Sequence, residues 1–251
     1  MLGRMTRQPF LLAAGAVLGS LLVAGCGSEP VMSGPSGVDS LEIPTPSADP
    51  ADFVEGIDNQ WLPLAHGNAW VYESMGTEQE TTTVTVTDQT KVIQGVTTTV
   101  VHDVVTDADG EVLEDTFDWF AQDSAGNVWY FGEDSTEYDE QGRPDTEGSW
   151  EAGVDGAQAG IVMLAKPRVG DGYQQEFSEG VAEDRATVLS LDESVNVPFG
   201  SFADLLQTQE TNPLEPGVTE RKYYARGVGL VFEEGVSGSF ERSQLVDFTQ
   251  K

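Results

Sequence analysis

The sequence predicts an all-β fold: an antiparallel up-and-down meander of about ten strands that forms a barrel, a half-barrel or a strongly curled sheet. First, from residue 68 onward, apolar and β-branched residues alternate with polar ones over short runs. Second, clusters of Gly, Pro, Asn and Asp separate these runs. Third, the tetrapeptide Asp-x-x-Gly recurs at residues 107–110, 123–126 and 139–142, sixteen residues from one Asp to the next.

The N-terminus has the features of a secretory signal peptide over residues 1–25. Two Arg residues precede an apolar run of 13 residues, and small residues follow it. Because a membrane-spanning helix needs about 20 apolar residues, a permanent span is not expected here. The sequence LVAGC at residues 22–26 resembles the bacterial lipobox, in which the Cys receives a diacylglycerol before cleavage. This resemblance implies that Cys26 is the lipidation site.

Residues 26–52 are predicted to be a lipidated Cys and a disordered acidic tether, followed by one β-domain at residues 53–251. Pro, Ser, Gly and Asp dominate the tether, which cannot bury enough apolar surface to offset the entropy of ordering. Cys26 is the only Cys of the chain, so we expect no disulfide and no thiol catalyst in the domain. We therefore expect the protein on the extracytoplasmic face of the bacterial cell membrane, held there by its lipid.

The predicted strands can be assigned in chain order. Residues 81–88 alternate Val with Thr, and residues 94–105 are rich in β-branched side chains. Residues 111–122 place aromatic side chains on one face and acidic ones mostly on the other. In residues 127–133, apolar residues occupy odd and even positions alike, as in a strand that is covered on both faces. Further strands are expected at residues 183–194, 202–210, 217–225, 227–234 and 238–248.

Residues 156–167 are the best candidate for a short helix or an ordered loop. Gly is frequent at the start of this segment, and Pro167 ends it. Two roles remain open for it, a lid over the end of a barrel and a plain connection.

The three Asp-x-x-Gly tetrapeptides are interpreted as turns. Each falls between two strand-like runs, where Asp can accept a hydrogen bond from the backbone and Gly can supply a positive φ. A calcium loop of the EF type needs Gly at its sixth position and a bidentate Glu at its twelfth. The first tetrapeptide has Gly at the fourth position and Asp118 at the twelfth, so the spacing does not fit and no metal site is predicted.

The formal net charge of −31 limits the classes of partner. No basic stripe exists to neutralise phosphates, so nucleic acid is not an expected partner. Anionic lipid headgroups would also repel the domain, which leaves the lipid anchor as the means of attachment. The acidity serves either solubility or the binding of a basic envelope protein.

No recognisable catalytic motif is present. The sequence lacks Gly-x-Ser-x-Gly and His-Glu-x-x-His, and its two His residues are His66, in a loop, and His102, in a predicted strand. No glycine loop for a nucleotide phosphate follows a strand, so no cofactor is expected. A pair of carboxylates for glycoside hydrolysis is compatible with 43 acidic residues, but that abundance gives no means of choosing the pair. The catalytic residues, if the protein is an enzyme, are unknown.

Aromatic residues on the predicted strands are the best candidates for a ligand site. Inward aromatic side chains of a curled sheet can line a pocket for an apolar ligand or stack on a sugar. The candidate ligand-binding residues are Trp70, Tyr72, Trp119 and Trp129. The alternative is that these side chains only fill the core.

The segments FVEGIDNQWLPLAHGNAWVYE (residues 53–73) and YYARGVGLVFEE (residues 223–234) resemble a group of bacterial secreted proteins and lipoproteins without an established activity. Their shared pattern is GIDNxxxPLxxGxxWxYE near the start and YYAxGVGLV near the end. The resemblance implies one domain of curled antiparallel sheet and supplies no catalytic residues.

The leading functional hypothesis is a membrane-anchored, non-enzymatic module that binds a small apolar or amphipathic ligand or an envelope partner. Two alternatives remain. One is an acid/base hydrolase that acts on envelope glycans, and the other is a structural module whose acidic face binds a basic protein.

Overall fold

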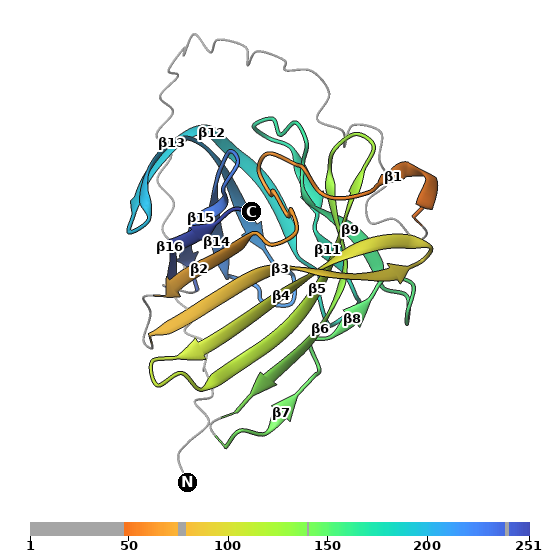
Figure 1. Ribbon diagram of the computed structural model, residues 1–251, viewed down its shortest axis with the longest axis horizontal. Coiled ribbons are helices and arrows are strands. Elements are labelled where there is room, and N and C mark those ends of the chain that lie inside the picture. Colours follow the sequence, from red (N-terminus) through yellow and green to blue (C-terminus); the bar gives the residue numbers. More distant parts are fainter. Residues whose placement is uncertain (1–47, 75–78, 140, 239–240) are drawn as a thin grey trace, which may run out of the picture. The chain divides into compact units, whose positions relative to one another are not determined.

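The computed structural model describes residues 48–74, 79–139, 141–238 and 241–251, and the structural statements below concern these residues. The predicted signal peptide, Cys26 and most of the predicted tether lie outside them. Figure 1 shows a system of curved strands, preceded by one turn of 3-10 helix, η1 (Pro50–Asp52). Within the ranges given above, no helix has the length and apolar character that a membrane crossing requires.

Thirteen strands form the wall of a nearly closed barrel, and each is antiparallel to its neighbours. In chain order the wall strands are β2 (Ala69–Ser74), β3 (Glu80–Ile93), β4 (Val96–Asp107), β5 (Val112–Asp123), β6 (Val128–Tyr138), β9 (Gln158–Met163), β10 (Gly172–Gln174), β11 (Glu176–Phe177), β12 (Arg185–Val197), β13 (Gly200–Thr211), β14 (Thr219–Ala225), β15 (Gly229–Ser237) and β16 (Arg242–Thr249). Three short strands pair beside this path: β1 (Phe53–Val54) with β5, and β7 (Pro144–Asp145) and β8 (Trp150–Glu151) with β6.

The wall is closed by a short segment that pairs on both sides. β10 pairs with β12, whereas β11, which begins two residues after β10 ends, pairs with β9. Gly160 allows the close approach between β9 and this segment, because a Cβ atom there would lie 2.4 Å from the carbonyl oxygen of Gln175. On the other side of the barrel, the first and last wall strands, β2 and β16, pair with each other. Strands that are neighbours along the chain are therefore neighbours round the wall, except where β10 and β11 close it: there β9 pairs with β11, and β12 pairs with β10.

The all-β antiparallel meander is thus confirmed, and it forms a barrel. The described part of the chain contains sixteen strands, compared with the prediction of about ten. Strands of two or three residues, such as β10 and β11, are too short to show the alternation on which the prediction depends.

The expectation of a helix or loop at residues 156–167 is wrong, because β9 lies there. Ala159, Ile161 and Met163 are almost fully buried, and so is Gly160 between them. A strand that is buried on both faces has no polar side to alternate with its apolar side, so its period is hidden.

The turn interpretation of the three Asp-x-x-Gly tetrapeptides is confirmed. In each of them one carboxylate oxygen of Asp accepts hydrogen bonds of 2.9–3.0 Å from the backbone N–H groups two and four residues later. The Gly N–H donates to the Asp carbonyl oxygen, and each Gly has a φ between +69° and +94°. The turns connect β4 to β5, β5 to β6, and β6 to β7.

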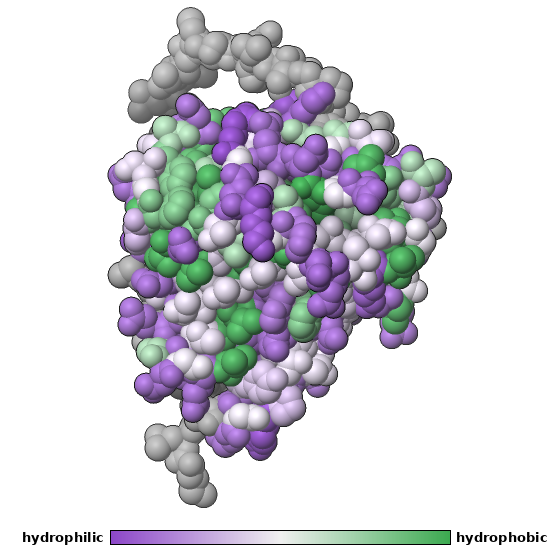
Figure 2. All heavy atoms as spheres, viewed as in Figure 1, coloured by the Kyte–Doolittle hydropathy of each residue, from purple (hydrophilic) through white to green (hydrophobic). Residues whose placement is uncertain are grey.

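The apolar segment at residues 127–133 is covered on both faces, as predicted. The five residues that begin β6 are all buried. On the outer side of the wall, Phe53 of β1 packs edge-on against Trp129 and Phe131, with ring centroids 6.0 and 5.4 Å apart. Hydrophilic residues are spread over the face of the molecule shown in Figure 2 and separate its apolar areas.

Candidate functional site: a cavity inside the barrel

A cavity of about 600 Å³ lies inside the barrel. Side chains from eight wall strands line it: β2, β3, β4, β5, β9, β14, β15 and β16. The register explains this arrangement, because directly paired residues such as Trp70 and Val84 point to the same side of the sheet. On β2 to β5, residues of one parity face the cavity, and those of the other parity face outward.

One end of the cavity is apolar. Its lining consists of Leu62, Leu64, Trp70, Phe120, Tyr224 and Leu230. The loop of residues 57–68 closes this end, since it is tied to turns on two different parts of the wall. The Asn59 side chain donates to the carbonyl oxygen of Gly126 at 2.8 Å, and the Gln60 carbonyl accepts from the N–H of Gly227 at 2.7 Å. Most of the GIDNxxxPLxxG part of the sequence pattern therefore forms the closed end of the barrel.

Trp70 and Tyr72, two of the predicted ligand-binding residues, both line the cavity from β2. The indole of Trp70 donates to the carbonyl oxygen of Val228 at 2.6 Å, and the hydroxyl of Tyr72 donates to that of Leu230 at 3.0 Å. Both side chains are thus fixed by their polar atoms and present ring surface to the cavity.

Trp119 and Trp129, the other two predicted ligand-binding residues, do not line the cavity. Trp119 points out of the wall, where the Nζ atom of Lys91 lies 3.2 Å from its ring centroid. Trp129 donates its indole N–H to Asp123 at 2.9 Å and packs against Phe53. The structure brings Trp70 and Tyr72 together and leaves Trp119 and Trp129 on the outer side of the same sheet.

The middle of the cavity wall is acidic. The register of β4, β5 and β6 places Asp103 beside Thr116, and it places Asp118 beside Glu133 in the next row. Glu114 lies one row further along β5, on the same face. One oxygen of Asp118 accepts from the Tyr130 hydroxyl at 2.6 Å, whereas Oδ1 of Asp103 is buried and has no hydrogen-bond partner among the described residues.

Burial perturbs the pKa values of these carboxyl groups. Burial and the neighbouring charges of Asp118, Glu114 and Glu133 raise the pKa of Asp103 to about 8. Burial also raises the pKa of Asp118 to about 6, although the hydrogen bond from Tyr130 opposes the increase. Burial and the charge of Asp118 raise the pKa of Glu133 to about 8. At neutral pH this wall therefore holds both protonated and ionised carboxyl groups.

Lys222 of β14 is the basic residue in the middle of the cavity. Its Nζ atom lies 2.8 Å from Oε2 of Glu210 and 3.9 Å from Oε1 of Glu233. Burial alone would lower the pKa of Lys222, but these two carboxylates outweigh burial and raise it well above its ordinary value. Lys222 is thus a permanently charged and already paired group.

A smaller cavity of about 200 Å³ adjoins the first one and shares Val162, Glu220 and Lys222 with it. Glu176 and Asp184 line the smaller cavity and share a hydrogen bond. Two carboxyl groups can do so only if one is protonated, and burial together with this bond raises the pKa of Glu176 to about 10. Gln175, only 6% exposed, also lines this cavity, and its Oε1 atom has no partner among the described residues.

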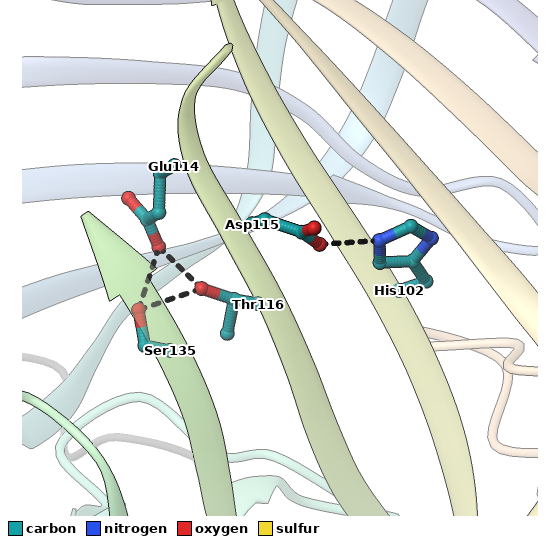
Figure 3. Close-up of polar contacts among 5 residues, drawn as sticks. All are labelled: His102, Glu114, Asp115, Thr116 and Ser135. Carbon is teal, nitrogen blue, oxygen red and sulfur yellow. Dashed lines mark hydrogen bonds and ion pairs between the residues drawn. The ribbon is translucent and has the colours of Figure 1, made fainter. Parts of the chain in front are cut away.

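His102 takes no part in the cavity. Figure 3 shows that it points to one side of the sheet with Asp115, while Glu114, Thr116 and Ser135 form a hydrogen-bonded group on the other side. His102 Nε2 lies 2.6 Å from Asp115 Oδ1, and its ring stacks on Phe117 with centroids 4.3 Å apart. The sheet thus separates the hydroxyl groups from the His–Asp pair, and these residues form no nucleophile–His–Asp triad. The expectation that His102 is a hydrogen-bonded sheet residue is confirmed.

The described residues contain no group of three or more His, Cys, Asp or Glu side chains arranged to hold a metal ion. The acidic groups of the cavity are spread along the wall, and the Asp side chains of the three turns each use one carboxylate oxygen for backbone N–H groups.

The sequence prediction did not identify the acidic cavity residues Asp103 and Asp118, nor Lys222. The signal was the alternation in β5, where Glu114 and Asp118 were correctly placed on the face opposite Phe117 and Trp119. In most antiparallel sheets the polar face is the solvated one, but here it faces the cavity. That the polar face of the sheet points inward can be recognised only when the sheet is known to close into a barrel.

The fold and the cavity together define an antiparallel β-barrel with an acidic internal site. Two solved structures are similar to it. One is a protein of Bacteroides fragilis, provisionally described as exported and as having a YmcC-like fold; it is 14% identical, the match covers 76% of this chain and 100% of that one, and the TM-score is 0.45. The other, provisionally described as a lipoprotein of Parabacteroides distasonis, is 11% identical, with 76% and 99% covered and a TM-score of 0.43. No family model and no curated protein sequence matches this chain.

Proposed function

We propose that the protein is a non-enzymatic binding protein, lipid-anchored on the extracytoplasmic face of the membrane, and that the barrel cavity holds a small amphipathic ligand. The observation that carries the proposal is the cavity itself, at about 600 Å³. Sites for small molecules have volumes of roughly 300–1,000 Å³ and combine apolar walls with a few fixed polar groups. Here the apolar end is closed by the loop before β2, and carboxyl groups lie further along the same wall.

The test of ligand binding is native mass spectrometry of the full chain, released from its host membrane without added ligand. The expected result is an organic adduct that is lost on denaturation. A Val105→Trp variant, which places a large side chain in the cavity, should lack the adduct. Val104→Trp is the matched control, because Val104 lies on the same strand and does not line the cavity. An adduct retained equally by both variants would place the ligand elsewhere and contradict the proposal.

The anchor is supported by the lipobox resemblance at residues 22–26. Replacing Cys26 by Ser in the full chain should release the protein from the membrane fraction and abolish labelling by a fatty-acid probe. Ser28→Ala, two residues further along the chain, should leave both unchanged. Labelling that persists in the Cys26 variant would exclude this residue as the lipid site.

One observation favours an acid/base hydrolase as the second candidate. Asp103 and Asp118 are neighbouring carboxyl groups whose pKa values, about 8 and about 6, bracket neutral pH. Such a pair can supply one protonated and one ionised carboxyl group, as glycoside hydrolysis requires. New reducing ends on envelope glycans incubated with the protein, absent for Asp118→Asn, would support the hydrolase. Glycans left intact by the wild type would exclude it.

A further inference from the structure

We propose that the ligand of the cavity is an amphipathic organic cation, whose positively charged head lies against the acidic wall of β4 and β5 and whose apolar body lies against Trp70 and Phe120. The inference rests on the proposed function and names the chemical class of the ligand. Three features of the described residues support it: the charge of the lining, the kind of polar atom left unpaired, and the position of the apolar end.

The lining is unbalanced in charge. Six acidic side chains face the larger cavity, and two basic ones do so. The acidic ones are Asp103, Glu114, Asp118, Glu220, Glu233 and Glu241.

Both basic residues already have partners. Lys222 lies 2.8 Å from Glu210, and Arg242 lies 3.7 Å from Glu234. Neither basic residue is therefore available to neutralise Asp103 or Asp118. The negative charge of the lining would repel an anionic ligand. A cationic ligand would supply the missing charge.

Among the residues that line the cavities, the unpaired buried polar atoms are acceptors when Asp103 is ionised, which is the form that a bound cation would stabilise. Oδ1 of Asp103 and Oε1 of Gln175 are buried and receive no hydrogen bond from the described residues. A buried acceptor without a donor is unfavourable, so a ligand that brings donors gains by satisfying these atoms. An ammonium group has three donors and no acceptor, whereas a carboxylate has acceptors only. The unpaired atoms therefore select for an ammonium-like or guanidinium-like head.

The ionisation of the wall agrees with this inference. The carboxyl groups of Asp103 and Glu133 have raised pKa values because they are buried near other acids without a cation. A bound cation would stabilise their ionised forms, so its binding should release protons.

The apolar end determines the shape of the ligand. Phe120 lies toward the end that is closed by Leu62 and Leu64, and Asp118 and Glu114 follow at increasing distance from it along β5. Asp103 lies in the same cross-strand row as Trp70, with Val84 between them. A ligand that satisfies both ends must carry its charge at one end of an apolar body. A metal ion would fill only the acidic part, and no three acidic side chains of the described residues converge to bind one.

The experiment compares octylamine, octanol and octanoate, which share one chain and differ in the head group. Binding is measured calorimetrically to the full lipidated chain in discs of neutral lipid, with empty discs as the blank. We expect octylamine to bind at least about tenfold more tightly than octanol, and octanoate not to bind. Val105→Trp should abolish octylamine binding, and Val104→Trp should not.

Two further variants test the acidic wall. A double variant, Asp103→Asn with Asp118→Asn, should weaken octylamine binding at least about tenfold and leave octanol binding unchanged. Asp134→Asn, on the exposed face of β6, is the matched control and should have no effect.

Each contrary result has a different meaning. Octanol or octanoate binding as tightly as octylamine, and being blocked by Val105→Trp, would overturn the cationic head and leave the cavity as a binding site. No binding by any of the three probes, together with no adduct on the native protein, would overturn both proposals.

Discussion

The indole N–H of Trp70, on β2, reaches the carbonyl oxygen of Val228 at 2.6 Å, although β16 lies between β2 and β15, which begins one residue after Val228. The Tyr72 hydroxyl makes the corresponding bond to Leu230 at 3.0 Å. The two parts of the sequence pattern, near the start and the end of the domain, therefore meet in the structure. β15 and β16 pair directly only at three residues, Phe232–Glu234, so these side chains satisfy carbonyl groups beyond that ladder.

Replacing Tyr72 by Phe removes only the hydroxyl and leaves the carbonyl of Leu230 without its donor. We expect a loss of about 1–3 kcal/mol in the free energy of unfolding, because that acceptor becomes unsatisfied. Denaturant unfolding measures the loss. Tyr138→Phe is the control, since no hydrogen bond of its hydroxyl is found among the described residues. Equal losses in the two variants would refute the role of the Tyr72 bond.

Asp103→Asn should change the pH dependence of stability. The pKa of Asp103 rises from 3.8 to about 8 on folding, so the folded state holds a proton that the unfolded state has lost. Stability should therefore fall as the pH rises from about 4 to about 8. The charges of Asp118, Glu114 and Glu133 face Asp103, and each of them raises its pKa further.

The measurement is the Tm of the wild type and of Asp103→Asn at pH 5 and pH 8. The fall in Tm between these pH values should be smaller in the variant, by at least about 3 °C. Asp134→Asn corrects for the reduced negative charge of the whole chain. If both variants show the same pH dependence, Asp103 does not carry the effect.

Asp123, in the second Asp-x-x-Gly turn, should contribute far more to the stability of the fold than Asp139 in the third. Asp123 is buried and accepts four hydrogen bonds, from the backbone of Ala125, the backbone and side chain of Asn127, and Trp129. Asp123→Ala should cost about 3 kcal/mol, because these buried donors lose their acceptor. Asp139→Ala, in the same kind of turn but exposed, should cost less than about 1 kcal/mol. Thermal denaturation with and without a chelator completes the test, since a calcium-dependent Tm would contradict the turn interpretation.

Gly160→Ala should disturb the closure of the barrel. Its Cβ atom would lie 2.4 Å from one carbonyl oxygen and 2.7 Å from another, both of which belong to backbone that cannot rotate away. We expect a loss of about 1–3 kcal/mol from overpacking. Gly148→Ala is the control, because nothing lies within 4 Å of its Cβ position. Unchanged stability in Gly160→Ala would mean that β9 and the β10–β11 segment separate without cost.

The sequence predicted the meander well where strands are long and turns are chemically distinct. The Asp-x-x-Gly spacing located β4, β5 and β6, and the alternation placed Trp70 and Tyr72 on one face. The prediction failed at β9, where burial on both faces removes the alternation of apolar and polar residues. It also failed at β10 and β11, which have only three and two residues.

The site was harder to predict because its residue types are common in this chain. With 43 acidic residues, no local property distinguishes Asp103 or Asp118 from an acid on the surface. What distinguishes them is pairing across three strands, which depends on register and closure. Of the four aromatic residues predicted to bind a ligand, Trp70 and Tyr72 line the cavity, and Trp119 and Trp129 do not. Register and closure again make the difference, because Trp119 packs beside Lys91 and Trp129 beside Phe53 on the outer face.

The pairing of β2 with β16 also bears on how the chain acquires its fold. β2 ends at Ser74 and β16 begins at Arg242, so a polypeptide emerging from the ribosome has made almost the whole barrel before β2 finds its second neighbour. Contacts so distant along the chain form slowly, and the edge of β2 stays unpaired in the meantime. The last strand of the wall thus protects its first strand, and any factor that delays folding until β16 has been synthesised would favour the closed barrel over aggregation.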